Sequence, residues 1–568
     1  MHAASITPFR FGCALAGAIL ATSNLSAAVH LPGDLRIDNV DFERHVMGVL
    51  GKMGCNSGSC HGSFQGKGGF RLSLFGYDPD KDYFALTRES LGRRIDPVNP
   101  ERSLFLLKPT GQVDHGGGMR FGRDSWQYRL LQEWIAGGAR RLKGNGEIAE
   151  ITISPPELAF TKPGETGQLS VQARFANGAR EDITPLCDFR VNDDAIAEVT
   201  ALGRVSALRG GDTAVVVSYR GQLLPVRVLV PVAASPGFRY PQVPEANYID
   251  HEVFAKLKRL NIVPSGLADD AEFLRRVTID TIGSLPEPEE VRRFLANPDP
   301  NKRGKKIDEL LDHPLHAALW ATKFCDITGN NTDALENPPQ LKPKRSQMWH
   351  DWFRKRLAEN MPYDQIVRGV LCATSRDGLS PEQWLKQVRE IDETAQKAFD
   401  TKYAERPSLD LFWRRAQQVP IEQWGEKTAA AFLGVRLECA QCHKHPFDRW
   451  TQADYRSYAN IFGQLAFGLS PEAKKLVDEE NAARAKKQPA KGKAALAVVR
   501  EVFIGGKGQT LRDPDTNRPL PAKALGGPVI NATKGQDARL PLFDWLRSPD
   551  NPYFARCFVN RVWGHYFG

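Results

Sequence analysis

The stretch CAQCH, residues 439–443, could attach a prosthetic group covalently. In a Cys-x-x-Cys-His segment, the thiols of Cys439 and Cys442 can form thioether bonds with haem, and His443 can bind its iron. Two other interpretations stay open. The cysteines could form a disulfide beside a surface histidine, or they could hold zinc together with His443 and His445, although zinc usually takes ligands from a second segment.

A related stretch, CNSGSCH, lies near the start of the chain and contains Cys55, Cys60 and His61. It has four residues between the cysteines instead of two. Gly58 and the small serines allow this longer loop to bend, so both sulfurs can still reach the edge of a porphyrin. The spacing predicts a second covalent haem c. A disulfide between Cys55 and Cys60 is the alternative.

A six-coordinate haem needs a second axial ligand, and the stretch TGQVDHGGGMRF offers two near the first motif. We favour His115 and place Met119 second, because the surrounding glycines allow the backbone to approach the ring. The alternative for His115 is a loop histidine bonded to solvent. No distal ligand is evident for a haem at His443, and an open iron position there would allow a small molecule to bind.

Helical patterns surround the first motif. Apolar residues at helical spacing precede it in VDFERHVMGVLGKMGC, and SWQYRLLQEWIAGGARRL places Tyr128 and Trp134 on one helical face. Gly137 and Gly138 should end this second helix. Two such helices around a Cys/His motif have the layout of a small cytochrome c.

The first residues have the features of a secretion signal. Arg10 supplies the positive end, FGCALAGAIL is the apolar stretch, and Ser26–Ala28 offer small residues for cleavage. We therefore expect a periplasmic, secreted or cell-surface protein. No stretch predicts a transmembrane segment. The formal net charge of +9 over 568 residues is modest, and it indicates a slightly basic surface with no nucleic-acid partner.

The fold class expected is multidomain: an all-α cytochrome-c-like domain, then an Ig-like β-sandwich, then a mainly α domain. Short alternating runs with Gly, Pro and Asn-Gly punctuation indicate the sandwich. The stretch REVFIGGKGQTLRDPDTNRPL suggests a hairpin. The segments expected are a signal peptide (1–28), a haem domain (38–145), the sandwich (149–235), a linker (236–247), a helical domain with the second motif (248–470), a charged helix or linker (471–500), and a helical unit that is cut short (525–568).

Several of these segments resemble known families. MGCNSGSCHGSFQGKGGF through WIAGGA resembles the cytochrome-c-like N-terminal domain of large secreted planctomycete-type proteins, and LSVQARFANGAREDITP with its continuation resembles the group 2 bacterial Ig-like domain. FLGVRLECAQCHKHPFDRWTQADY is similar to domain of unknown function 1549, a planctomycete cytochrome domain. NPYFARCFVNRVWGHYFG resembles the opening of domain of unknown function 1553. The resemblance implies a c-type cytochrome of undefined role, associated with polysaccharide breakdown.

Together these observations predict an extracytoplasmic c-type cytochrome with one or two haems, acting in electron transfer with an unidentified redox protein partner. Whether the protein is an enzyme stays open, and an electron carrier is favoured over a catalyst. One rival is a haem-dependent oxidoreductase linked to polysaccharide breakdown. The other is a surface-binding or adhesion protein that recognises a cell-surface glycan and keeps its cysteines in disulfides.

Overall fold

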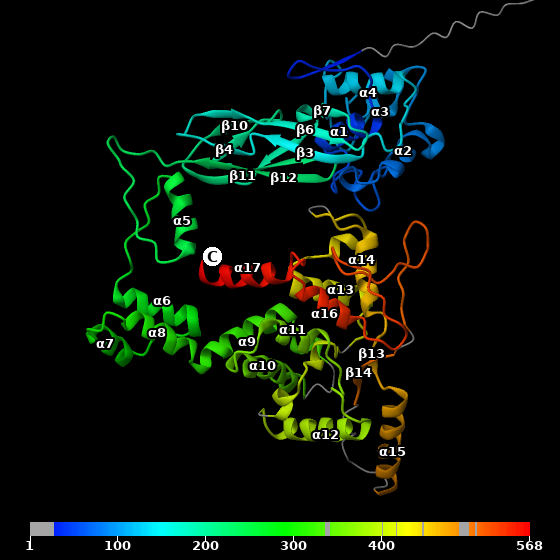
Figure 1. The fold of residues 1–568 in the computed structure, drawn as a ribbon. Helices are drawn as coiled ribbons and strands as arrows, with labels where there is room; N and C mark the ends of the chain where they lie inside the picture. Colours follow the sequence, from blue (N-terminus) through cyan, green and yellow to red (C-terminus); the bar gives the residue numbers. More distant parts are fainter. Residues whose placement is uncertain are drawn as a thin grey trace, which may run out of the picture. The chain divides into compact units, whose positions relative to one another are not determined.

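The computed structural model describes residues 28–335, 341–399, 401–415, 417–445, 448–487, 499–505 and 508–568. The predicted signal peptide lies outside these ranges, apart from Ala28. The chain forms two compact units that meet in sequence between Pro264 and Ser265. Within the described ranges, no helix combines the length and apolar character that crossing a membrane requires. Figure 1 shows both units, with strands concentrated in the first and helices in the second.

The first motif follows a short helix at the start of the first unit. A π-helical turn, Phe42–Val46, runs into α1 (Met47–Lys52), and the side chain of Asp41 caps it by accepting a hydrogen bond from the Arg44 amide. The predicted second helix is α4 (Trp126–Ala136), which ends at Gly137 as expected. The rings of Phe42 and Trp134 pack with their centres 5.3 Å apart, so the two helices contact each other directly.

The all-α domain expected over residues 38–145 is not a separate unit, because this segment belongs to the first unit together with the strands before and after it. The strands β1 (Val29–Leu31) and β2 (Leu35–Ile37) form an antiparallel ribbon, and β1 packs against α4. Between α1 and α4 the only α-helices are α2 (Pro79–Thr87) and the single turn α3 (Leu104–Leu107), with long loops around them. An all-α cytochrome-like domain is therefore not shown. The glycine-rich composition of this region favours loops over longer helices.

Strands dominate the following segment. They form a three-stranded sheet in the order β3-β6-β7, a four-stranded sheet in the order β4-β12-β11-β8, and a three-stranded sheet in the order β5-β10-β9. The pairing is antiparallel except between β12 and β4. The strands are β3 (Ile148–Ser154), β4 (Glu157–Ala159), β5 (Thr166–Gln168), β6 (Ser170–Phe175), β7 (Arg180–Asp182), β8 (Asp188–Val191), β9 (Ala197–Val199), β10 (Arg204–Ala207), β11 (Gly211–Tyr219) and β12 (Gln222–Val230).

The helical part and the strands share one hydrophobic core. Phe42 and Val46 belong to the same buried cluster as Phe175 and Val217. The Tyr219 hydroxyl, at the end of β11, donates a hydrogen bond to the Arg44 carbonyl (2.7 Å). The helices that flank the first motif are thus packed directly on the sheets.

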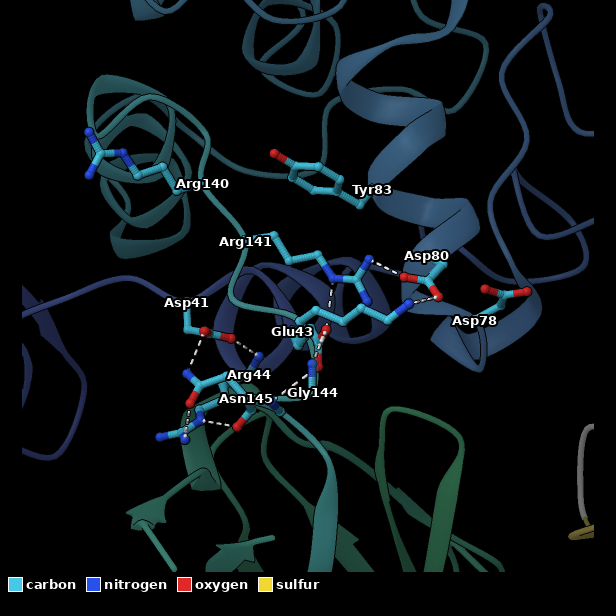
Figure 2. A network of polar contacts seen from close by, with 12 residues as sticks. Asp41, Glu43, Arg44, Asp78, Asp80, Tyr83, Arg140, Arg141, Gly144 and Asn145 are labelled. Atoms are coloured by element: carbon cyan, nitrogen blue, oxygen red, sulfur yellow. Dashed lines mark hydrogen bonds and ion pairs between the residues drawn. The ribbon is translucent and has the colours of Figure 1, made fainter. Parts of the chain in front are cut away.

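A buried polar network reinforces this junction (Figure 2). The Glu43 carboxylate accepts hydrogen bonds from Arg141 Nε (2.7 Å) and from the amides of Gly144 and Gly146 (3.2 and 3.1 Å). Arg141 also reaches Asp80 at the start of α2 (2.5 Å). Glu43 is only 2% exposed, so its charge depends on these donors for stabilisation.

A second buried pair extends the junction into the strands. The Arg44 guanidinium donates to Glu181 in β7 (2.5 Å) and to the Asn145 carbonyl (2.9 Å), and it lies over the Phe175 ring. His45 Nδ1 accepts the Asp41 amide (2.8 Å), so the Nε2–H of His45 is the donor to Glu181 (2.9 Å).

The helix α5 (Tyr248–Arg259) also belongs to the first unit. Lys256 forms an ion pair with Asp212 on β11 (2.6 Å), and Arg259 pairs with Glu157 on β4. The Val232 amide donates to the Leu260 carbonyl (2.8 Å). The helix therefore packs on the strands that precede the predicted linker.

The second unit is mainly helical, as predicted. Its core is aromatic, with Trp349, Trp352 and Trp413 fully buried in one cluster. Its helices are α6 (Asp270–Ile282), α7 (Pro288–Ala296), α8 (Lys302–Leu311), α9 (Pro314–Thr328), α10 (Lys342–Ala358), α11 (Tyr363–Leu371), α12 (Pro381–Lys397), α13 (Ile421–Thr428), α14 (Gln452–Ala459), α15 (Pro471–Lys487), α16 (Arg539–Arg547) and α17 (Phe554–Tyr566). The first part of the charged segment is thus the helix α15, and residues 488–498 lie outside the described ranges.

The predicted hairpin after Arg500 is wrong in its pairing. The strand β14 (Glu501–Ile504) pairs antiparallel with β13 (Leu465–Gly468). In the sequence, α15 lies between these two strands. Val502 is fully buried in the core of the unit, and this burial selects the partner. A single bridge between Arg512 and Pro519 is the local remnant of the expected turn.

Candidate functional site

The loop of the first motif is folded back on itself by backbone hydrogen bonds. The His61 amide donates to the Cys55 carbonyl (3.0 Å), and the amides of Cys60 and Gly62 both donate to the Ser57 carbonyl (3.0 Å each). The four residues between the cysteines therefore form a compact turn. It brings the last residue of the motif next to the first, despite the longer spacing.

His61 is oriented by the loop that follows it. Its Nδ1 donates to the Phe70 carbonyl (3.0 Å), and the Leu72 amide donates to the His61 carbonyl (2.8 Å). Because a carbonyl can only accept, Nδ1 carries the proton and Nε2 keeps a lone pair. Burial lowers the pKa of His61, and the neighbouring His115 lowers it further. The ring is therefore held neutral, with one nitrogen ready to bind a metal.

His115 faces His61 and has the same arrangement of its ring nitrogens. Its Nδ1 donates to the Gly118 carbonyl (2.8 Å), so its Nε2 also keeps a lone pair. The two ring centres are 6.3 Å apart and the ring planes differ by 11°. His115, the favoured second ligand, therefore lies beside His61, and its role as a ligand stays a prediction. Met119 is 71% exposed and does not line the cavity described next, so its placement does not support ligation.

Both cysteines and both histidines line one cavity of about 590 Å³. A volume of this size is typical of sites for organic ligands and cofactors. The wall contains apolar side chains and a group of cations. The lining residues besides Cys55, Cys60, His61 and His115 include Leu50, Phe70, Leu104, Phe105, Lys67, Arg93, Arg94, Lys108 and Arg120.

The two thiols of the first motif are free and lie in different surroundings. Burial raises the pKa of Cys55 to about 11, although Arg120 lowers it in part. Cys60 is close to the Arg120 guanidinium, whose Nη2 lies 3.5 Å from the sulfur. The alternative interpretation, a disulfide between Cys55 and Cys60, is not formed in this structure.

The second motif lies at the surface of the second unit. The predicted apolar helix comprises α13 and a π-helical turn that ends at Leu433, and Cys439 follows in a short turn. Cys439 and Cys442 are exposed free thiols, whereas His443 is half-buried and donates from Nδ1 to the Lys444 carbonyl (2.6 Å). Among the described residues no three His, Cys, Asp or Glu side chains cluster to hold a metal ion, so the four-ligand zinc arrangement is not formed.

Sequence reasoning missed the groups that orient and surround the first motif. The carbonyls of Phe70 and Gly118 fix the two histidines, and Arg120 lies beside Cys60. Backbone carbonyls leave no signature in a sequence. The sequence did contain one signal for the cations of the cavity wall, because Lys67, Arg93 and Arg120 occur in the glycine-rich loops near the motif.

Comparison with known families covers the end of the first unit and parts of the second. Residues 248–466 match the family described as a protein of unknown function (DUF1549), and residues 538–568 match a protein of unknown function (DUF1553). Two of the predicted resemblances are therefore confirmed. The resemblances of the N-terminal and Ig-like segments stay predictions. No curated protein matches the chain.

Proposed function

We propose that the protein is an extracytoplasmic c-type cytochrome that carries electrons through a haem held in the cavity of the first unit. Cys55 and Cys60 would attach the haem, and His61 and His115 would bind its iron. The observation that carries this proposal is the position of the two histidines, whose ring centres lie 6.3 Å apart and which line one cavity together with both cysteines.

The residues present fit such a group. A metal–imidazole bond is about 2 Å long and the ring centre lies roughly 1 Å behind the nitrogen, so two imidazoles sharing one ion have centres about 6 Å apart. The observed 6.3 Å agrees with this arrangement. Leu50, Phe70 and Phe105 offer apolar surface for the porphyrin faces, and the cations of the wall suit its two carboxylates.

Bound haem supplies a one-electron couple between ferric and ferrous iron. His61 and His115 would both hold the iron, because the hydrogen bond from each Nδ1 to a carbonyl leaves a lone pair on Nε2. Two protein ligands leave no position for a substrate, which favours a carrier over a haem oxidoreductase at this site. Two histidines also favour a lower reduction potential than a histidine–methionine pair.

The second motif extends the proposal to two haems. The spacing of Cys439, Cys442 and His443 predicts covalent attachment, and both thiols are accessible at the surface. An open iron position at this motif would be the place for the alternative, oxidoreductase function. Whether the chain carries one haem or two is therefore the first question for experiment.

The test is a pyridine haemochrome spectrum of denatured protein, produced in a host with the cytochrome c maturation system. We expect one covalent haem that is lost in the variant Cys55→Ser/Cys60→Ser, and a second that is lost in Cys439→Ser/Cys442→Ser. Retention of all haem in the first variant would exclude attachment in the cavity. Absence of haem from the unmodified protein would exclude the cytochrome function and favour adhesion.

A further inference from the structure

The second unit can satisfy a buried arginine with its own carbonyl oxygens. Arg356 on α10 is buried, and its guanidinium donates to the carbonyls of Trp352 (2.9 Å), Ala404 (3.0 Å) and Arg406. These acceptors replace the water that the side chain loses on burial, because a buried donor without an acceptor costs free energy. We therefore expect other buried arginines of this unit to have acceptors for their donors as well.

Arg415 lacks most of these acceptors. It is 6% exposed, and its Nη1 donates to the carbonyl of Gly329, where α9 ends (3.2 Å). This position suits a cation, because the C-terminal end of a helix carries partial negative charge. The contact uses only one nitrogen, however. Nε and Nη2 of Arg415 are both buried, and neither has a hydrogen-bond partner among the residues that the structure describes.

The two nitrogens without a partner form one edge of the guanidinium, which we call the donor edge of Arg415. The N–H bonds of Nε and Nη2 point in parallel on this edge, and such a pair binds two oxygens of a carboxylate or a phosphate side by side. The central carbon of the guanidinium lies 5.1 Å from the centre of the Trp349 ring and 5.9 Å from that of Phe412. These buried rings restrict the orientation of the donor edge.

The positive charge of Arg415 is also uncompensated within the described part of the chain. Burial lowers the pKa of Arg415 to about 10, and no carboxylate opposes this shift. A second cation, Lys427 on α13, lies close by. Burial lowers the pKa of Lys427 and Arg415 lowers it further, whereas Glu426 raises it. Two neighbouring cations, one of them buried, repel each other unless an anion lies beside both.

We propose that Arg415 and Lys427 bind a phosphate group, carried either by inorganic phosphate or by a small organic phosphate monoester. The donor edge of Arg415 binds two phosphate oxygens, and the Lys427 ammonium group binds a third. A phosphate monoester has a charge of about −1.5 to −2 at pH 7, which matches two cations better than the single charge of a carboxylate. This inference goes beyond the proposed function and does not depend on haem, because neither residue belongs to a haem motif.

The first experiment titrates inorganic phosphate, and separately phenyl phosphate, into the full chain by isothermal titration calorimetry at constant ionic strength. We expect one saturable site, with tighter binding of phenyl phosphate if the ligand is a monoester and tighter binding of inorganic phosphate if it is the free ion. Arg415→Lys keeps the charge but loses the parallel donors, and it should weaken binding by roughly tenfold or more. Lys427→Met should weaken it a few-fold. The matched control is Lys386→Met, which removes an exposed lysine on α12 and should leave the affinity unchanged.

A second measurement separates loss of binding from loss of folding. In phosphate-free buffer, Arg415→Met should melt at a higher temperature than the unmodified protein, because an apolar side chain replaces the uncompensated buried charge. Added phosphate should raise the melting temperature of the unmodified protein and leave that of Arg415→Met unchanged. A lower melting temperature of Arg415→Met in phosphate-free buffer would show that the chain itself already compensates the charge, and it would overturn the proposal.

A carboxylate of the chain is the competing partner for the donor edge. Glu336 directly follows Leu335, whose backbone bridges to that of Arg415, and Glu336 lies outside the described ranges. Glu336→Gln should leave phosphate binding unchanged. Phosphate binding that appears only in Glu336→Gln would assign the donor edge to Glu336 and overturn the proposal. Absence of saturable phosphate binding by the unmodified protein, or an equal affinity for acetate, would overturn it too.

Discussion

The rings of His61 and His115 lie 6.3 Å apart at an interplanar angle of 11°, and each donates from Nδ1 to a carbonyl of its own loop. The two loops are separated by more than fifty residues in sequence, yet both histidines line one cavity. Metal-binding histidines commonly have a hydrogen bond of this kind on the other ring nitrogen, because it fixes the tautomer and the orientation of the ring.

The first prediction concerns the second axial ligand. His115→Ala should convert a six-coordinate, low-spin haem into a high-spin haem that binds added imidazole, because no other side chain takes its place. Absorption spectra with and without imidazole measure this change. Met119→Ala is the control, since Met119 is 71% exposed, and its spectrum should match that of the unmodified protein. A low-spin spectrum in His115→Ala, together with a changed spectrum in Met119→Ala, would assign the ligand to Met119.

The second prediction concerns the glycine that follows the motif histidine. A Cβ at Gly62 would lie 2.0 Å from the Asn56 carbonyl oxygen, within the turn that folds the motif. Gly62→Ala should therefore open the turn and reduce haem attachment by roughly tenfold or more. The reason is that this one turn positions both cysteine sulfurs and the His61 ring. Gly58→Ala is the matched control, because its Cβ would meet only Leu74 at 3.8 Å. Haem content per chain is the measurement, and equal content in both variants would contradict the role of Gly62.

The third prediction concerns a buried carboxyl group behind the motif loop. Asp82 is 1% exposed and accepts hydrogen bonds from the Ser73 amide (2.5 Å) and hydroxyl (2.7 Å). Burial raises its pKa from 3.8 to about 7, although the Ser73 hydrogen bonds oppose this shift. The folded state therefore binds a proton more tightly than the unfolded state. Stability should fall as pH rises from about 4 to about 7, by up to about 4 kcal/mol, and stay level above that range.

Hydrogen exchange of the peptides from residues 71–87, measured from pH 4 to pH 8 and corrected for intrinsic rates, tests this dependence. Asp82→Asn should remove most of it, since the amide does not titrate. Asp194→Asn, at an exposed position among the strands, should leave it unchanged. A pH dependence that persists in Asp82→Asn would assign it to another group.

The fourth prediction concerns the junction of helices and strands in the first unit. Glu43→Ala removes the acceptor of Arg141 and of two backbone amides, and the Arg141 and Glu43 side chains are only 10% and 3% exposed. Loss of one member of a buried pair costs roughly 3–5 kcal/mol. Backbone hydrogen exchange should therefore become faster both in α4 and in β6, because these two elements share one hydrophobic core.

The control for this junction is an exposed ion pair on the sheets. Glu150→Ala removes the partner of Arg174, and a pair with this exposure contributes about 0–1 kcal/mol. Its exchange pattern should match that of the unmodified protein. Faster exchange in α4 alone after Glu43→Ala would show that helices and strands unfold separately.

Local patterns in the sequence predicted the helices around the motifs. The periodicity of Tyr128 and Trp134 and the stop at Gly137 correspond to α4, because a helix of this length is decided by its own apolar spacing and termini. The pairing of β14 was not predictable in the same way. Its partner β13 lies before a long helix, and only burial of Val502 in a distant core selects it.

The sequence by itself determined which residues could attach and bind a haem, because the spacing of two cysteines and a histidine is a property of a few consecutive residues. Only the tertiary structure decided that His115 faces His61, that Met119 points to solvent, and that Lys67 and Arg93 line the same cavity. These relationships join loops that are distant in sequence. They are set by the packing of α1, α4 and the sheets into one core, and such long-range packing has no local pattern that would predict it.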